Sequence, residues 1–411
     1  MKKPVVFIIF NRPDTTSVVF EEIRKYKPKR LLIIADGPRA NKENEKFLCE
    51  CTRNVIKVDW ECEVTKIYSE ENLGCKNRIV SGLNEVFELV DEAIILEDDC
   101  VPHEDFFTYC ENLLDFYKDE ERIMAISGDN FQKSDFEIQE SYYFSIYPHC
   151  WGWATWRRAW SKMDVEMKDW PKYEKSEEFK EICSDLFFKK YWTNIYNDTY
   201  LGEIDTWDYQ WTYSCWYHQG LTILPSVNLV SNIGFGENAT HTVSVDEIMA
   251  NLPVYSLEFP LKHPTCIKRN FEADYNTSEH IYNVGKLKEK INSESLKIEL
   301  LNYLTDIKNV QKLFENNVYI FGMGNLGKLL FLVFKGHGYS IDNFMVSKLS
   351  GEDQYFEGIT VIEPKDLIEK ENATILVTIE GRHDREIICD LQRRFKKYSI
   401  KIVSWKDIVN R

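Results

Sequence analysis

The chain has 411 residues, of which 44% are hydrophobic and 29% are charged, and 67 acidic against 51 basic side chains give a formal net charge of −16. At about 150 residues per domain, this length predicts two to three domains. The negative balance argues against a general electrostatic attraction to nucleic acid or anionic lipid, so we expect no nucleic-acid partner. Residues 315–411 hold 14 basic and 14 acidic side chains, so the whole excess lies before residue 315.

The eleven cysteines are scattered, odd in number, and include no CxxC pair with the spacing of a zinc site. We therefore expect reduced thiols and a cytoplasmic protein. The first apolar run, at 5–10, is too short for a signal-peptide core, and no run reaches the roughly 18 apolar residues of a membrane-spanning helix. Peripheral contact with a membrane stays open.

The first hundred residues alternate short apolar runs with amphipathic segments, a pattern typical of a parallel sheet flanked by helices. A helix is expected from a cap at Asp14 to Pro28, and two more follow the third and fourth strands. The expected strands are 5–10, 31–35, 64–68 and 93–96.

The rest of the chain divides into three parts. Residues 150–216 hold nine of the eleven tryptophans. A charged amphipathic stretch at 282–316 predicts a helical linker, and 317–411 show a second βαβ pattern. We therefore expect an α/β fold with a large domain at 1–281 and a smaller α/β domain at 317–411.

Acidic side chains follow two of the predicted strands. Asp36 follows the second strand, and Glu97, Asp98 and Asp99 follow the fourth. Adjacent like charges at a partly desolvated strand end are costly, and a divalent cation removes that cost. Ligands of open α/β sheets collect at the carboxyl ends of strands, where one or two carboxylates and substrate phosphates hold Mg²⁺ or Mn²⁺. The pattern predicts a site for a nucleotide diphosphate and its metal; the alternative is a solvated acidic turn.

Four short segments, taken in order, resemble GT-A-fold glycosyltransferases. They are Val-Phe-Ile-Ile-Phe-Asn-Arg-Pro at 6–13, Ala-Asp-Gly-Pro at 35–38, Asn-Leu-Gly-Cys-Lys at 72–76 and Ile-Leu-Glu-Asp-Asp-Cys-Val-Pro at 95–102. The acidic triplet resembles the motif of the Golgi N-acetylglucosaminyltransferases, and the remainder is similar to bacterial sugar transferases of the family 2 type. The resemblance covers about residues 1–260. It implies a GT-A-type nucleotide-diphospho-sugar transferase domain, followed by a Rossmann-like domain.

The resemblance also implies roles for single residues. Asp36 would contact the nucleobase, and Asn11 and Arg12 would form a wall of its pocket. Asp98 would approach the ribose, and Asp99 would bind the metal that bridges the diphosphate. This agrees with the residue chemistry, because a departing diphosphate needs cationic stabilisation.

Further residues could complete this site. Lys76 and Arg78 are candidate phosphate partners; the alternative is an exposed helix start. His241 is a candidate metal ligand, because many enzymes resembling this one complete the metal shell with a late histidine, whereas a lone histidine is commonly structural. Gly234 and Gly236 would let the backbone pass close to the diphosphate.

Two acids near tryptophans are candidates for the catalytic base. Asp205 and Asp208 lie in an aromatic stretch, where burial could raise a carboxylate pKa towards the working pH. In related inverting transferases the base is a carboxylate at the start of a helix after the acceptor segment, which favours Asp208 over Asp205. The alternative, a helix N-cap, fits Asp205 well.

The aromatic block at 150–160 carries Trp153, Trp156 and Trp160 at helical spacing. Large rings with a polar edge could form platforms for sugars, and Arg157 or Arg158 could meet an anionic acceptor. The alternative is ordinary core packing. The block also resembles the acceptor region of the same bacterial transferases.

The last hundred residues carry Gly322, Gly324 and Gly327 between a predicted strand and a helix, the context of a dinucleotide fingerprint. The second strand, which ends near 346–348, has no acidic residue that could bind a ribose hydroxyl, so NAD is disfavoured. The alternative is a phosphorylated ribose, whose phosphate Lys348 could contact. We expect an accessory domain, structural or ligand-sensing.

These observations favour a metal-dependent, inverting glycosyltransferase of the hexosyl or N-acetylhexosaminyl class. It would use Mn²⁺ or Mg²⁺ and move a sugar from a nucleoside-diphosphate sugar donor to a carbohydrate or lipid-linked glycan acceptor, and the resemblance suggests bacterial surface polysaccharide or lipopolysaccharide synthesis. One alternative is a sugar-nucleotide-forming nucleotidyltransferase, which the absence of glycine at 11–14 disfavours. Another is a nucleotide-binding regulatory or scaffold protein.

Overall fold

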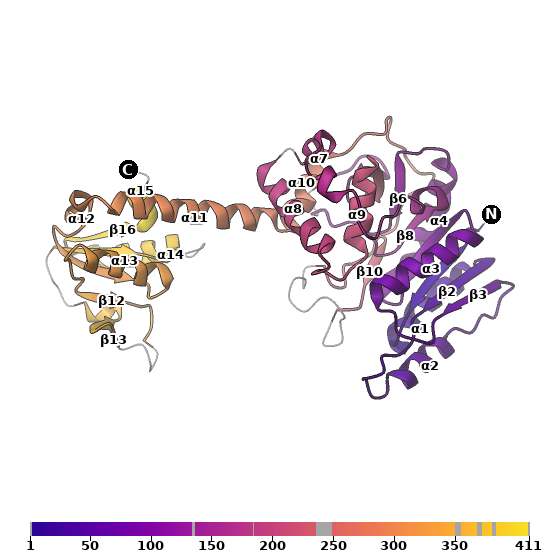
Figure 1. The fold of residues 1–411 in the computed structure, drawn as a ribbon, viewed down its shortest axis with the longest axis horizontal. Helices are drawn as coiled ribbons and strands as arrows, with labels where there is room; N and C mark the ends of the chain where they lie inside the picture. Colours follow the sequence, from indigo (N-terminus) through magenta and orange to yellow (C-terminus); the bar gives the residue numbers. More distant parts are fainter. Residues whose placement is uncertain are drawn as a thin grey trace. The chain divides into compact units, whose positions relative to one another are not determined.

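The computed structural model describes residues 2–133, 136–183, 185–235, 249–349, 355–367, 372–379 and 384–409. The chain forms two compact units, residues 1–285 and residues 286–411 (Figure 1). The expected α/β class, with a large sheet domain followed by a smaller one, is confirmed. No helix in the described part of the chain is long and apolar enough to span a membrane.

The first unit is built on an eight-stranded sheet in the order β3-β2-β1-β4-β8-β6-β9-β7. The strands β3, β2, β1 and β4 are parallel to one another, β8 is antiparallel to β4 and β6, β6 is parallel to β9, and β7 is antiparallel to β9. The parallel sheet predicted for the first hundred residues is confirmed, and the mixed half was not predicted. The strands are β1 (Val5–Ile9), β2 (Arg30–Ala35), β3 (Glu63–Tyr68), β4 (Glu92–Glu97), β6 (Ile123–Ser127), β7 (Tyr142–Ser145), β8 (Trp153–Trp156) and β9 (Leu221–Pro225), with a separate antiparallel pair of β5 (Cys100–Pro102) and β10 (Val230–Asn232).

Helix α1 (Pro13–Tyr26) starts two residues earlier than predicted. Pro13 opens it, because the fixed φ of proline suits the first helical position. The predicted cap at Asp14 is therefore wrong: Arg12 is the N-cap residue, and Asp14 lies in the first turn. Lys27, in a left-handed conformation with φ of 53°, ends the helix before Pro28.

Helix α2 (Glu45–Val55) was not predicted. Its buried side chains are Glu45, Cys49 and Thr52, so it shows no apolar stripe at helical spacing. The helices predicted after the third and fourth strands are confirmed as α3 and α4. The remaining helices of this unit are α3 (Cys75–Leu89), α4 (Glu104–Phe116), α5 (Arg157–Trp160), α6 (Trp170–Tyr173), α7 (Glu177–Ile182), α8 (Leu186–Tyr200), α9 (Asp208–Tyr217) and α10 (Phe271–His280).

The aromatic block packs into the core of the first unit. Trp153 and Trp156 lie on β8 and Trp160 ends α5, so the helical spacing that we read there is wrong. All three rings are at most 3% exposed. The platform interpretation is therefore wrong for these rings, and the alternative, core packing, is confirmed.

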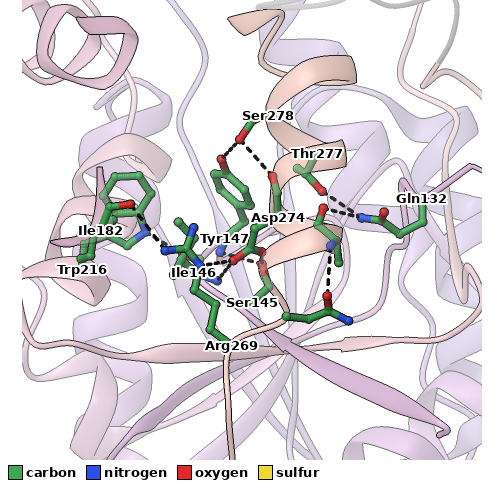
Figure 2. Close-up of polar contacts among 12 residues, drawn as sticks. Gln132, Ser145, Ile146, Tyr147, Ile182, Trp216, Arg269, Asp274, Thr277 and Ser278 are labelled. Carbon is green, nitrogen blue, oxygen red and sulfur yellow. Dashed lines mark hydrogen bonds and ion pairs between the residues drawn. The ribbon is translucent and has the colours of Figure 1, made fainter. Parts of the chain in front are cut away.

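Helix α10 is fixed to the sheet through the buried Asp274 (Figure 2). Its Oδ1 accepts a hydrogen bond from Ser145 Oγ at 2.5 Å, and its Oδ2 accepts from Arg269 Nε at 2.6 Å and from the backbone N–H of Ile146 at 3.4 Å. Burial raises the pKa of Asp274, against the lowering effect of Arg269. Ser145 ends β7, so this cluster connects α10 to the last strand of the sheet.

The second unit has a six-stranded sheet in the order β13-β14-β12-β11-β15-β16, parallel except for the β13–β14 pair. Two apolar clusters cover its faces, one with α13 and the other with α14. Its elements are β11 (Asn317–Phe321), α13 (Asn325–Gly336), β12 (Asn343–Met345), β13 (Tyr355–Phe356), β14 (Ile359–Ile362), η1 (Pro364–Asp366), β15 (Ala373–Val377), α14 (Asp384–Arg394), β16 (Ile400–Ser404) and α15 (Trp405–Val409).

Two helices occupy most of the stretch that we predict as a linker, α11 (Val284–Leu304) and α12 (Ile307–Leu313). Val284 packs in the core of the first unit, whereas Leu300 and Leu304 pack in the core of the second. The division into 1–281, 282–316 and 317–411 stays a prediction.

Candidate active site

A cavity of about 260 Å³ lies at the carboxyl ends of β2, β1 and β4. Its floor is built by residues that follow these strands, because parallel strands end at the same edge of a sheet. The cavity brings together most of the residues predicted for the donor site: Asn11, Arg12, Asp36, Arg78, Glu97, Asp98, Asp99 and Gly234. It also includes residues that the sequence did not single out: Ile8, Ile9, Phe10, Arg39, Asn72, Gly74, Cys75, Ile79, Trp151, Asn232 and Phe235.

Asp36 fixes the loop that leads into α3. Its two carboxylate oxygens accept hydrogen bonds from the backbone N–H groups of Gly37, Leu73 and Gly74 and from Asn72 Nδ2, at 2.9 to 3.1 Å. These four donors match the roughly four lone-pair sites of a carboxylate. Asp36 lies at the cavity, but its acceptor capacity is used within the protein.

Asn11 and Arg39 share one partner, the buried Glu45. Asn11 Nδ2 and Arg39 Nε each donate to the Glu45 carboxylate at 3.0 Å, and the side-chain hydrogen bonds from Arg39 keep the pKa of Glu45 below its usual value. Arg39 also lies over the ring of Phe10, 5.6 Å from its centre. This end of the cavity has an aromatic ring and a guanidinium held by one acid on α2.

Arg12 contacts the acidic triplet and not the Asn11 side of the cavity. Its Nη2 forms ion pairs with both Asp98 and Asp99, the latter at 2.9 Å. Burial raises the pKa of Asp98, and burial together with the two neighbouring carboxylates raises the pKa of Glu97. Three clustered acids therefore share one nearby guanidinium, and the site has an excess of negative charge.

Gly234 makes room beside Asp99. Strand β10 pairs with β5 so that Asn232 lies opposite Cys100, and the N–H of Ile233 donates to the backbone oxygen of Asp99 at 2.9 Å. An ideal Cβ at Gly234 would lie 2.0 Å from Asp99 Oδ2, so no larger residue fits without a shift. Gly236 and His241 lie outside the described residues.

The residues present fit a divalent cation. No group of three or more His, Cys, Asp or Glu side chains that could hold a metal occurs among the described residues. Mg²⁺ and Mn²⁺ sites in transferases, however, commonly use one or two carboxylates and complete their shell with substrate phosphates and water. Asp99 is such a carboxylate and lines the cavity, and the Gly234 backbone packs directly against it.

Arg78 is a buried cation at the wall of the cavity. It is 6% exposed on α3, which makes the alternative of an exposed helix start wrong for this residue. Its Nε and Nη2 are buried without a hydrogen-bond partner, and Glu85 approaches Nη2 only to 3.5 Å. Lys76 does not line the cavity; its Nζ pairs with Asp205 at 3.0 Å.

The two candidate bases differ in their surroundings. Asp208 is the first residue of α9 and is half-buried; its Oδ1 accepts from Thr206 Oγ1 and from the N–H of Tyr209. It is close enough to Glu97 to raise the pKa of that side chain. Asp205 is exposed and precedes the helix by three residues, so the N-cap alternative for it is wrong.

The prediction that Arg157 or Arg158 meets an anionic acceptor is wrong. Arg157 pairs with Asp91, and Arg158 donates to the backbone oxygens of Lys118, Tyr117 and Ile123. Both lie at the amino ends of β4 and β6, away from the cavity, and stabilise the sheet there.

Comparison with protein-family models and with curated protein sequences found no match. Among solved structures, the chain is similar to a mannosyltransferase from Pyrobaculum calidifontis in complex with GDP-Man and Mn²⁺, at 15% identity and a TM-score of 0.29, over 43% of this chain and 52% of that one. It is also similar to residues 1–349 of S. aureus TarS, at 11% identity and a TM-score of 0.31, over 55% of this chain and 58% of that one. A third similar structure is 4-diphosphocytidyl-2C-methyl-D-erythritol synthase from Anaerococcus prevotii, at 9% identity and a TM-score of 0.27, over 60% and 95%.

The chain thus spans little more than half the length of the first two of these proteins. TM-scores of this size carry no argument about activity.

Proposed function

We propose that the protein is a metal-dependent glycosyltransferase that uses a nucleoside-diphosphate sugar. One observation carries the proposal: a single cavity at the carboxyl edge of a parallel sheet gathers the triplet Glu97, Asp98 and Asp99 with the cations Arg12 and Arg78. The more specific parts of the proposal rest on the sequence and its resemblance to known transferases. They are inversion, transfer of a hexosyl or N-acetylhexosaminyl group to a glycan or lipid-linked acceptor, and a cytoplasmic role in bacterial surface polysaccharide synthesis with peripheral membrane contact.

Charge balance supports the metal. The triplet contributes up to three negative charges to the cavity, and Arg12 and Arg78 contribute two positive ones. Each phosphate of the donor adds a further negative charge. A bound Mn²⁺ or Mg²⁺ would supply the missing positive charge and, when bound, would stabilise the diphosphate as it leaves. Asp99 would hold it, and Asp98 would approach the ribose.

The chain's own residues have separable tasks in this reaction. Phe10, Asn11, Arg39 and the loop held by Asp36 would bind the nucleoside end. Arg78 would contact a phosphate, because it lines the cavity and two of its guanidinium nitrogens, Nε and Nη2, have no hydrogen-bond partner in the described part of the chain. A guanidinium fixed in place stabilises developing charge without reorganising at the moment of reaction.

Asp208 would take the proton from the attacking acceptor hydroxyl. Its Oδ1 accepts hydrogen bonds from Thr206 Oγ1 and from the N–H of Tyr209, and Oδ2 would take the proton. A base that faces the sugar from the side opposite the diphosphate gives inversion at the anomeric carbon. Asp205 remains the second candidate, and its ion pair with Lys76 would have to open first.

The second unit is proposed as an accessory module, structural or ligand-sensing. Gly322 has a φ of +112°, and an ideal Cβ at Gly327 would lie 2.1 Å from Gly322 O, so both positions require glycine. An ideal Cβ at Gly324 meets nothing within 4 Å. These are the features that let a backbone approach a phosphate.

The activity test uses the full chain with UDP-, GDP-, ADP- and dTDP-sugars, with and without Mn²⁺. Slow hydrolysis in the absence of acceptor is expected to release one nucleoside diphosphate, and EDTA should abolish the release. Release of pyrophosphate from a nucleoside triphosphate and a sugar phosphate would instead show a nucleotidyltransferase. Absence of both reactions, with no binding of any nucleotide, would contradict the proposal.

A further inference from the structure

Aromatic side chains line the end of the cavity beyond the acidic triplet. The position of this end along the sheet edge indicates which part of the donor it would contact. The edge of the sheet carries, in spatial order, Asp36 after β2, Arg12 after β1, the triplet at β4, and Trp151 just before β8. Neighbouring strands lie about 4.8 Å apart, so this row spans about 14 Å. A donor with its nucleoside at the β2 end and its diphosphate at the triplet extends its sugar towards Trp151.

The strand register places Trp151 beside the triplet. In the antiparallel pairing of β4 with β8, Ile95 lies opposite Trp153. Two residues further along each strand, the same register brings Trp151 level with Glu97. Trp151 and Phe235 both line the cavity at this end.

The indole of Trp151 is held from its edges. Phe131 and Phe235 meet it in edge-to-face contacts, with ring centres 5.2 and 5.6 Å away and interplanar angles of 84° and 78°. The ring is half-buried, and no acceptor for its Nε1–H occurs among the described residues. Unlike Trp153, Trp156 and Trp160, which are at most 3% exposed, this ring lines the cavity and is only half-buried.

We propose that Trp151, braced by Phe235 and Phe131, is the subsite for the sugar of the donor. The inference deepens the proposed function and rests on it. An indole face packs against the C–H face of a pyranose, and its N–H can donate to a hydroxyl. The nearby Asp208, whose Coulomb interaction reaches Glu97 and Cys150 at this end of the cavity, repels a second anionic group. The substrate class is therefore a neutral hexose or N-acetylhexosamine, and uronic acids are excluded.

The test compares two dissociation constants measured by calorimetry on the full chain with Mn²⁺. One is for the nucleoside diphosphate that binds among UDP, GDP, ADP and dTDP, and the other is for its neutral hexose and N-acetylhexosamine conjugates. The ratio of the two constants isolates the sugar. We expect the wild type to bind the better conjugate about tenfold more tightly than the nucleotide.

Trp151→Ala should bring this ratio close to one while the affinity for the nucleotide itself stays within about twofold, and Trp151→Phe should keep part of the gain. Trp60→Phe is the matched control, because this indole packs under α1 and donates to the backbone oxygen of Pro28. Unchanged nucleotide affinity also shows that the variants are folded.

Three results would overturn the inference. An unchanged ratio in Trp151→Ala would remove Trp151 from the sugar subsite while leaving the nucleotide site intact. Tighter binding of the uronic acid conjugate than of the neutral one would refute the substrate class. Absence of nucleotide binding by the wild type would refute the subsite and the proposed function together.

Discussion

Arg12 holds two carboxylates at once, and this contact decides how the acidic triplet responds to ligands. Its guanidinium pairs with Asp98 and Asp99 and is about one quarter exposed to the cavity. It therefore lowers the negative potential that attracts a cation, and it also offers N–H groups to an incoming phosphate. We therefore expect the same side chain to oppose binding of the proposed metal and to favour binding of the proposed donor.

Arg12→Gln should separate these two effects. Because the variant leaves the triplet without its nearest cation, Mn²⁺ alone should bind several-fold more tightly than it binds the wild type. With Mn²⁺ saturating, the nucleoside diphosphate should bind at least tenfold more weakly, because charge-assisted hydrogen bonds to phosphate are lost. Calorimetry with Arg24→Gln, an exposed ion-pair variant on α1, provides the control. Equal weakening of both ligands would contradict this role.

The base is tested by Asp208→Asn, which removes a proton acceptor and little volume. Turnover should fall by about 10² to 10⁴ while the dissociation constant of the donor changes less than about twofold. Asp205→Asn should lower turnover only a few-fold, since it breaks an exposed ion pair. Near-normal turnover of Asp208→Asn, with a large loss in Asp205→Asn, would transfer the role to Asp205.

At the scale of elements, α10 is connected to β7 by the buried carboxyl group of Asp274. Asp274→Ala should lower the free energy of unfolding by about 3–5 kcal/mol, because it leaves Arg269 and Ser145 without their acceptor in the interior. Urea unfolding followed by tryptophan fluorescence reports the first unit, which holds every tryptophan except Trp405. Glu272→Ala, an exposed change on the same helix, should cost less than about 1 kcal/mol.

The same variant has a pH signature. Since burial raises the pKa of Asp274 in the folded chain, the stability that this residue contributes is fully present below about pH 4, its unfolded value, and is lost as the pH rises through the raised value. The difference between wild type and Asp274→Ala should therefore shrink with rising pH. A difference that grows with pH would show that Asp274 is stabilised as the anion.

The elements also show where sequence patterns suffice. Strands β1, β2 and β4 are continuous apolar runs, so their parallel packing and the acids at the ends of β2 and β4 could be predicted. Helix α2 could not be predicted, because its buried face is formed mainly by polar side chains. The strand at Trp153 and Trp156 could not be predicted either, because these two residues have the three-residue spacing of a helix.

Within the site, the residue types could be predicted but several of their contacts could not. Asp36 has its acceptors occupied by the loop at Asn72, and Arg12 points to the triplet, which depends on side-chain directions that no spacing gives. Trp151, Arg39 and Phe235 join the cavity through tertiary contacts. For Trp151, the only signal in the sequence is the high aromatic content of residues 150–160.

At the scale of the molecule, the proposed donor site belongs to one unit. Every residue that lines the cavity precedes residue 236, and the apolar clusters of the two units share no member. Residues 1–285 alone should therefore keep the affinity of the full chain for nucleoside diphosphate and Mn²⁺ within about twofold. Calorimetry on both forms, with circular dichroism to establish folding, checks this. Loss of binding by a folded 1–285 chain would assign part of the site to the second unit.

The central claim, that the triplet and a divalent cation bind a diphosphate together, is tested most directly by one calorimetric series. The full chain and its Asp99→Asn variant are titrated with UDP, GDP, ADP and dTDP, with and without Mn²⁺. The account predicts that one nucleotide binds the wild type only when Mn²⁺ is present and that Asp99→Asn loses this binding, because one carboxylate fewer leaves too little charge for the cation. Equal binding with and without Mn²⁺, or binding that survives Asp99→Asn, would contradict it.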